Sequence, residues 1–143
     1  MSFVASLFFI KEKEKTMLKE TIKYVDYNGT EREEDFYFNL SKAELFEMQM
    51  GTTGGYEAMI NRIIAAQDAP ALIKIFKEII LKAYGVKSAD GKQFIKSEEL
   101  SAAFSQTEAY VNLYMKLVSD SDAAAKFVNG IMPANVSEQI AKQ

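Results

Sequence analysis

Residues 69–84 read APALIKIFKEIILKAY, and this stretch decides how the rest of the chain must pack. On a helix, its apolar side chains cover more than half of the circumference, and the lysines and Glu78 take up the remainder. Asp68 is a good N-cap, Pro70 suits the first turn, and Gly85 is the expected C-cap. The pattern predicts a central core helix that is too short and too charged to span a membrane.

The preceding residues 17–40 have the pattern of a β-hairpin. The turn signal Asn28-Gly29 separates a β-prone run from a return strand that carries Phe36 and Phe38 on one face. Neighbouring residues of a strand point to opposite faces, so the acidic run at the start of the return strand is expected to be solvated rather than to gather around a cation.

Short helices are expected on both sides of the central helix. Ser41 with Glu44 forms a capping box that opens a helix through about Met50, and the glycine-rich residues 51–55 connect it to a helix over about 56–67. That connector lacks the Lys-Ser/Thr pair of a phosphate-binding loop.

Two further helices are expected near the C-terminus. Ser105 with Glu108 forms a second capping box, Asp120 starts the last helix, and Gly130 and Pro133 are its stop signals. The sequence therefore predicts one globular domain of the α+β class, mostly α. It comprises a β-hairpin in residues 17–40 and a compact helical body in residues 41–133, with about five to six short helices.

Composition excludes several classes of function. The 143 residues include no Cys and no His, which removes thiol nucleophiles, thiolate metal sites, hydrolase triads and imidazole ligands. The net charge of −3 gives no overall attraction to nucleic acid or to anionic membranes. A protein partner is favoured.

The two ends of the chain stand apart from the body. Residues 1–16 form an N-terminal extension whose apolar part is too short to span a bilayer and lacks signal-peptide features. Lys13-Glu14 is compatible with an encoded ribosome-binding sequence, so we expect Met17 to be the natural start; a short strand or helix packed on the core is the alternative. Residues 134–143 form a polar tail.

The loop after the central helix has the spacing of an EF-hand calcium loop but poor ligands. Asp90 and Glu99 occupy the third and twelfth places, but Ser88 replaces the first carboxylate. Lys92 brings a cation to the fifth place, and Gln93 replaces the glycine of the sharp bend. We therefore predict that Ser88, Asp90 and Glu99 bind no metal and that the segment forms a turn followed by a helix whose N-cap is Ser97.

No catalytic or cofactor site is predicted. The carboxylates of Glu44, Glu98, Glu99 and Glu108 all have a capping or first-turn explanation, and no pair is forced together by its spacing. The chain is predicted not to be an enzyme and to need no cofactor.

The second half of the chain carries an extended pattern that comprises AYG at residues 83–85, DG at 90–91, Phe94, KSEEL at 96–100, TEAY at 107–110 and FVNGI at 127–131. This pattern resembles tail assembly chaperones of long-tailed phages of Gram-positive bacteria. A less distinctive part covers residues 36–45. Residues 1–16 and the tail after Pro133 lie outside this pattern.

The resemblance implies a non-enzymatic function. Such chaperones are thought to coat the long, aggregation-prone tape measure protein and to yield it as the major tail protein polymerises. The resemblance implies the tape measure protein as partner, with the major tail protein as a second candidate and a homo-oligomer left open. It implies the cytoplasm of the infected bacterial host as location, not the mature virion. It also implies a longer product made by frameshifting, for which residues 134–143 are the place to look.

Two other functions remain open at this point. A small phage regulator or anti-defence protein would also be acidic and would bind a host protein instead. A degenerate EF-hand-like calcium-binding module is a more remote alternative, because Lys92 and Ser88 oppose it.

Overall fold

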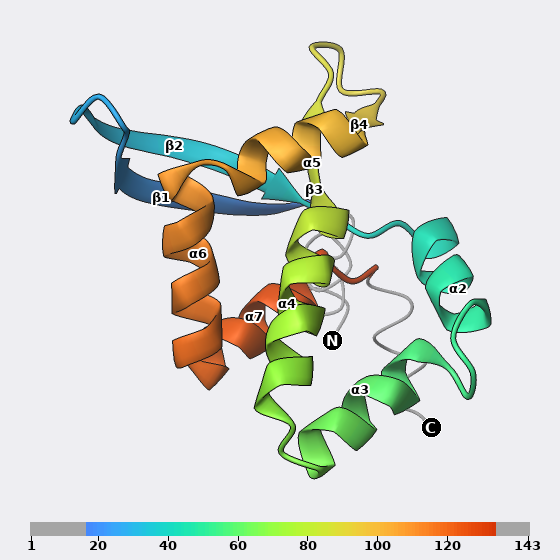
Figure 1. The fold of residues 1–143 in the computed structure, drawn as a ribbon. Coiled ribbons are helices and arrows are strands. Elements are labelled where there is room, and N and C mark those ends of the chain that lie inside the picture. Colours follow the sequence, from blue (N-terminus) through green and yellow to red (C-terminus); the bar gives the residue numbers. More distant parts are fainter. Residues whose placement is uncertain (1–16, 134–143) are drawn as a thin grey trace, which may run out of the picture.

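The computed structural model describes residues 17–133 and shows an antiparallel hairpin followed by six helices (Figure 1). The predicted class, α+β and mostly α, is confirmed. The expectations about residues 1–16 and 134–143 fall outside the described residues. In chain order the elements are β1 (Leu18–Val25), β2 (Glu31–Phe38), α2 (Lys42–Met50), α3 (Tyr56–Ala65), α4 (Ala69–Ala83), β3 (Tyr84–Lys87), β4 (Phe94–Ile95), α5 (Glu98–Ser105), α6 (Glu108–Ser119) and α7 (Ser121–Ile131).

The predicted hairpin is present, and β1 and β2 pair antiparallel along their whole length. Its connection is longer than a two-residue Asn-Gly turn. The Asp26 carboxylate accepts hydrogen bonds from the backbone N–H groups of Asn28 and Thr30, each at 2.9 Å. Gly29 adopts a φ of 83°, which glycine tolerates without strain. A side chain and a glycine therefore organise the loop together.

Two short strands extend the sheet to the order β1-β2-β3-β4, and they correct one prediction. The expectation that Gly85 caps the central helix is wrong, because α4 ends at Ala83 and Gly85 lies in β3. A Cβ atom at Gly85 would lie 2.8 Å from the Phe94 ring and 2.9 Å from the Ile95 carbonyl oxygen. The close approach of β4 therefore requires glycine at this position.

Four helix starts follow the capping residues predicted from the sequence. Ser41, Asp68, Ser97 and Asp120 each accept a hydrogen bond from a backbone N–H group in the first turn of the following helix. At Ser41 the capping box is complete, because Glu44 accepts in return from the Ser41 backbone N–H. These helices begin where local hydrogen bonding dictates.

Two other predicted helix boundaries are wrong. Ser105 is the last residue of α5, and Thr107 is the N-cap of α6, accepting from the Tyr110 backbone N–H at 3.1 Å. Gly130 does not stop α7 but lies inside it, where an added Cβ would come within 2.8 Å of a Leu18 methyl group. At Gly130, as at Gly85, the absence of a side chain permits close packing between elements.

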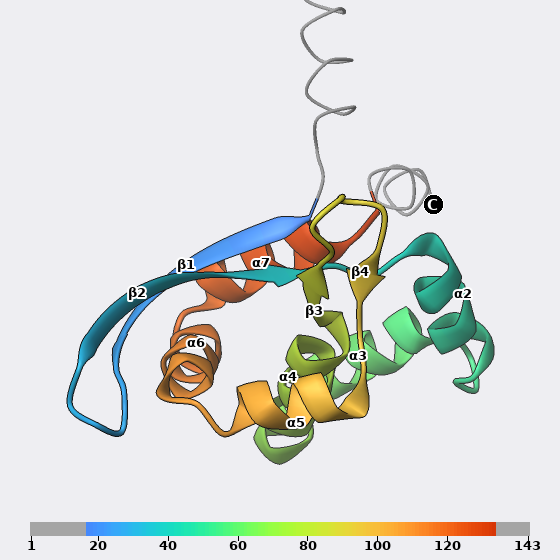
Figure 2. The same cartoon turned by 90° about the horizontal axis from the view of Figure 1, so that it is seen from above.

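The hydrophobic core lies between one face of the hairpin and the helices, with α4 at its centre, as predicted. Figure 2 shows β1 and β2 along one side of the molecule and α4, α5 and α6 together beneath them. Ile79, Ile80 and Ala83 of α4 are buried. The other buried residues of this cluster are Ile22, Phe38, Leu40, Ile75, Phe104, Ala109, Tyr110, Leu113, Leu117, Phe127 and Ile131. Within residues 17–133, no helix has the length and apolar character needed to cross a membrane.

Phe38 joins three separate segments of the chain through its ring. Its centroid lies 5.8 Å from that of Tyr84, 5.7 Å from that of Phe104 and 5.3 Å from that of Phe127. Tyr84 and Phe104 stack on each other with centroids 4.2 Å apart. The aromatic cluster therefore connects β2, β3, α5 and α7.

We expect Phe104→Ala to lower the free energy of unfolding by about 3–5 kcal/mol, because it removes a buried ring that touches four other rings. Phe46→Ala is the matched control, since Phe46 is 65% exposed and Phe104 only 3%. Phe46→Ala is expected to change stability by less than about 0.5 kcal/mol. Urea denaturation of both variants measures the difference, and equal losses would contradict the assignment of Phe104 to the core.

Candidate functional site

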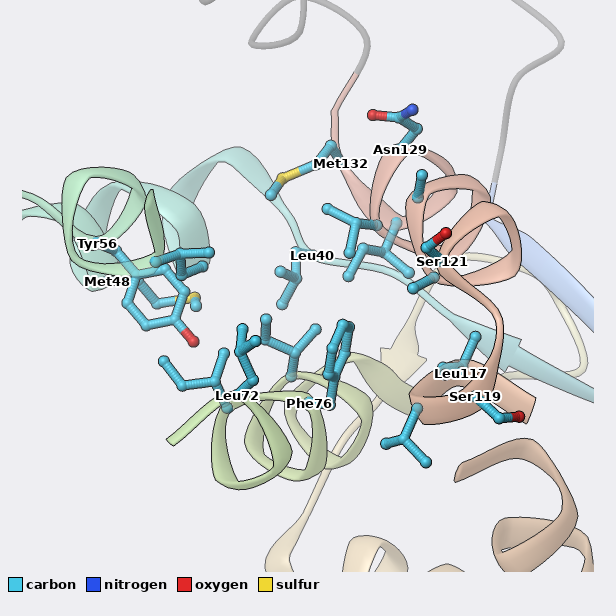
Figure 3. A pocket seen from close by; sticks show the side chains of 18 residues that line it. Leu40, Met48, Tyr56, Leu72, Phe76, Leu117, Ser119, Ser121, Asn129 and Met132 are labelled. Atoms are coloured by element: carbon cyan, nitrogen blue, oxygen red, sulfur yellow. The ribbon is translucent and has the colours of Figure 1, made fainter. Parts of the chain in front are cut away.

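An open apolar groove of about 680 Å³ lies between α4 and α7, with α2 and α3 at one end and the end of α6 at the other (Figure 3). Leu72 and Phe76 of α4 line one wall, and Ala125 and Val128 of α7 line the opposite wall. Leu40 lies between them. The residues that line the groove come from Leu40 and from the five helices α2, α3, α4, α6 and α7, together with Met132 after α7.

The groove arises because the other elements cover only part of the wide apolar stripe of α4. In the C-terminal half of α4, Ile79 and Ile80 are buried in the core. In the N-terminal half, Leu72 and Phe76 are only half-buried, because α7 packs mainly on α6 and β1 rather than on α4. Part of the stripe predicted to be core therefore faces an open groove.

The lining is uncharged. Among the residues described, none of the 18 that line the groove is Asp, Glu, Lys or Arg. Its polar members are Tyr56, Ser119, Ser121 and Asn129, and the rest are apolar. Burial and the nearby Glu78 carboxylate raise the pKa of Tyr56, so its hydroxyl stays protonated near neutral pH. Such a lining suits apolar side chains and disfavours phosphates, metal ions or charged substrates.

An ion pair fixes α2, which forms one end of the groove through Met48. The Lys96 ammonium donates to both carboxylate oxygens of Glu44, at 2.8 and 2.7 Å, and to the Asn39 carbonyl oxygen at 2.6 Å. Glu44 is also the reciprocal partner in the Ser41 capping box. The start of α2 is thereby tied to the segment between β4 and α5.

Because the ion pair is partly buried, the ionised form of each side chain is stabilised by the charge of the other. Burial alone would raise the pKa of the Glu44 carboxyl, but the hydrogen bonds from Lys96 and the Ser41 backbone outweigh it and hold that pKa below its usual value. Burial lowers the pKa of Lys96, and Glu44 only partly opposes that effect. Each charge therefore depends on its partner.

The loop with EF-hand-like spacing, which begins at Ser88, is organised by its own side chains. Ser88 donates a hydrogen bond to the Asp90 carboxylate at 2.7 Å, and Asp90 also accepts from the Lys92 backbone N–H. The backbone hydrogen bond from Lys92 and that from the Ser88 hydroxyl lower the pKa of Asp90. Glu99 lies in the first turn of α5. Among the side chains that the structure describes, no three of His, Cys, Asp or Glu are grouped so that they could hold a metal ion.

The glutamates considered as catalytic candidates occupy helix starts. Glu98 and Glu99 lie in the first turn of α5 and Glu108 in the first turn of α6, while Glu44 pairs with Lys96. The structure brings none of these four to the groove lining. The sequence did not identify the groove, and its only signal there was the unusual width of the α4 stripe.

A small α+β domain whose open groove has no charged side chain among the described lining residues suits the binding of apolar side chains. Over residues 17–143 the chain matches the family described as phage tail assembly chaperone, and it belongs to that family. The match includes residues 134–143, which the sequence pattern left outside. No curated protein and no solved structure gives a significant match. A chaperone family is a non-enzymatic class, in line with the predicted absence of catalysis.

We expect Glu44→Gln to destabilise the protein at pH 7 by about 1–3 kcal/mol, because the amide keeps the capping acceptor but leaves the half-buried Lys96 charge unpaired. Because the pKa of Glu44 is lower in the folded than in the unfolded protein, its ionised carboxylate stabilises the fold at a pH above the unfolded pKa of about 4.3. This stabilisation is lost as the pH falls through the folded pKa. The difference in free energy of unfolding between wild type and Glu44→Gln should therefore close below about pH 4.

The control for this prediction is Glu47→Gln, which makes the same change at an exposed position of the same helix. Urea denaturation at pH 7 and at about pH 3 measures both variants. A Glu44→Gln gap that persists at low pH would show that the effect does not come from the charge of Glu44.

Proposed function

We propose that this protein is the tail assembly chaperone that binds and solubilises the tape measure protein while the tail tube is assembled. Family membership supports the general role, and the observation that carries the specific proposal is the uncharged groove between α4 and α7. Its walls offer Leu72, Phe76 and Val128 to a partner without requiring a compensating charge.

The groove fits one face of an amphipathic helix. A helix with its side chains is about 10–12 Å across, so an open groove of about 680 Å³ accepts its apolar face and leaves the opposite face in water. The α7 wall is formed by an 11-residue helix, or about 16 Å, which corresponds to about three turns of a bound helix. A long helical partner would present many such segments.

The proposal also states where the chain acts and how the major tail protein takes part. Binding during assembly takes place in the cytoplasm of the infected bacterium, and the tape measure protein is released as the major tail protein polymerises around it. The chain then leaves before the virion is complete. None of these steps needs a cofactor or a bond-making reaction.

Co-expression with the tape measure protein of the same phage tests the proposal. We expect this chain to raise the soluble fraction of the tape measure protein and to copurify with it. Ala125→Glu, at an exposed position of the groove wall, should weaken binding about tenfold or more, because the bound apolar face would then cover a carboxylate.

The matched control is Ala103→Glu, the same change at an exposed position of α5 that does not line the groove. It should bind like wild type. Equal solubility of the tape measure protein with and without this chain would refute the chaperone proposal. Copurification of a host protein in its place would favour a regulator or anti-defence function.

A further inference from the structure

The end of α7 fixes the point at which the chain leaves the described fold. The Ile131 carbonyl oxygen accepts a hydrogen bond from the Leu40 backbone N–H at 2.9 Å, and both side chains are buried. Met132 follows and lines the groove, and in Figure 3 its side chain extends from the end of α7 toward the side of Met48 and Tyr56. The remaining ten residues, 134–143, therefore start at the edge of the groove.

The sequence of those residues, ANVSEQIAKQ, carries two large apolar side chains, Val136 and Ile140, four residues apart. Residues four apart share a side in a helix and in an extended chain alike, so the spacing is useful in either conformation. Ten residues span about 15 Å as a helix and about 33 Å when extended, which is enough to follow the α7 wall.

We propose that residues 134–143 occupy the groove of their own chain when no partner is bound, with Val136 and Ile140 as the contacts. The lining carries no charged side chain among the described residues, so it accepts this pair without an unpaired charge. An attached segment acts at an effective concentration in the millimolar range, which favours it over a second copy at ordinary concentrations. It also covers an apolar surface that would otherwise promote association.

In this arrangement residues 134–143 compete with the partner for the groove and so regulate partner binding. This regulatory role rests on the proposed function. A partner segment must displace the tail to bind, so weakly apolar segments are rejected. Removal or replacement of residues 134–143 would strengthen partner binding.

Fluorescence of 8-anilinonaphthalene-1-sulfonate with the full chain tests the proposal, because this dye brightens on exposed apolar surface. The double variant Val136→Asp/Ile140→Asp should raise the fluorescence several-fold, and adding Ala125→Glu should reverse much of that rise. Ser137→Asp/Gln139→Asp adds the same charge at polar tail positions and should resemble wild type. A chain that ends at Pro133 should behave like the first double variant.

Three results would overturn the proposal. The first is equal fluorescence for Val136→Asp/Ile140→Asp, its control and wild type. The second is a wild-type signal per chain that rises on tenfold dilution, which would assign the groove to a second copy. The third is a rise that Ala125→Glu leaves unchanged, which would place the exposed surface elsewhere. The assay contains no tape measure protein, so its failure is distinguishable from failure of co-expression.

Discussion

The packing of rings around Phe38 is the constraint on which the rest of the structure depends. Phe38 is fully buried in β2, and it meets Tyr84, Phe104 and Phe127 from three other elements. Because these rings follow or lie within α4, α5 and α7, their contacts hold these helices against the sheet. The helices that form the two walls of the groove, α4 and α7, are thus both attached at this junction.

The residues that carry the family pattern mostly build this junction and its caps. Tyr84 stacks on Phe104, Gly85 permits the close approach of Phe94, and Lys96 ties the segment before α5 to α2. Thr107 caps α6, and Phe127 packs on Phe38. The groove walls differ from this junction, because only Val128 of the four wall residues Leu72, Phe76, Ala125 and Val128 lies within the motifs. In this chain the motif residues therefore contribute mostly to the scaffold, and much of the groove surface comes from other positions.

The sequence predicted those features that depend on neighbours in the chain. The hairpin and the caps at Ser41, Asp68, Ser97 and Asp120 are local, and all are present. Gly85 and Gly130 were misassigned because a glycine that permits close packing looks the same in sequence as one that ends a helix. The groove was missed because the covering of an apolar stripe depends on tertiary packing, and Leu40, Met48 and Tyr56 meet only in the fold.

The shape and chemistry of the groove suit a holding function better than a permanent complex. A partner that buries one helical face gains apolar contact but meets no charged side chain among the described lining residues, so its affinity depends on area and fit, offset by the entropy of ordering. A lining of Leu, Ile, Val, Phe and Met side chains also tolerates different apolar sequences, because hydrophobic contact is not directional. Under the proposed function, modest affinity and broad tolerance would allow the chain to release its partner to the assembling tube.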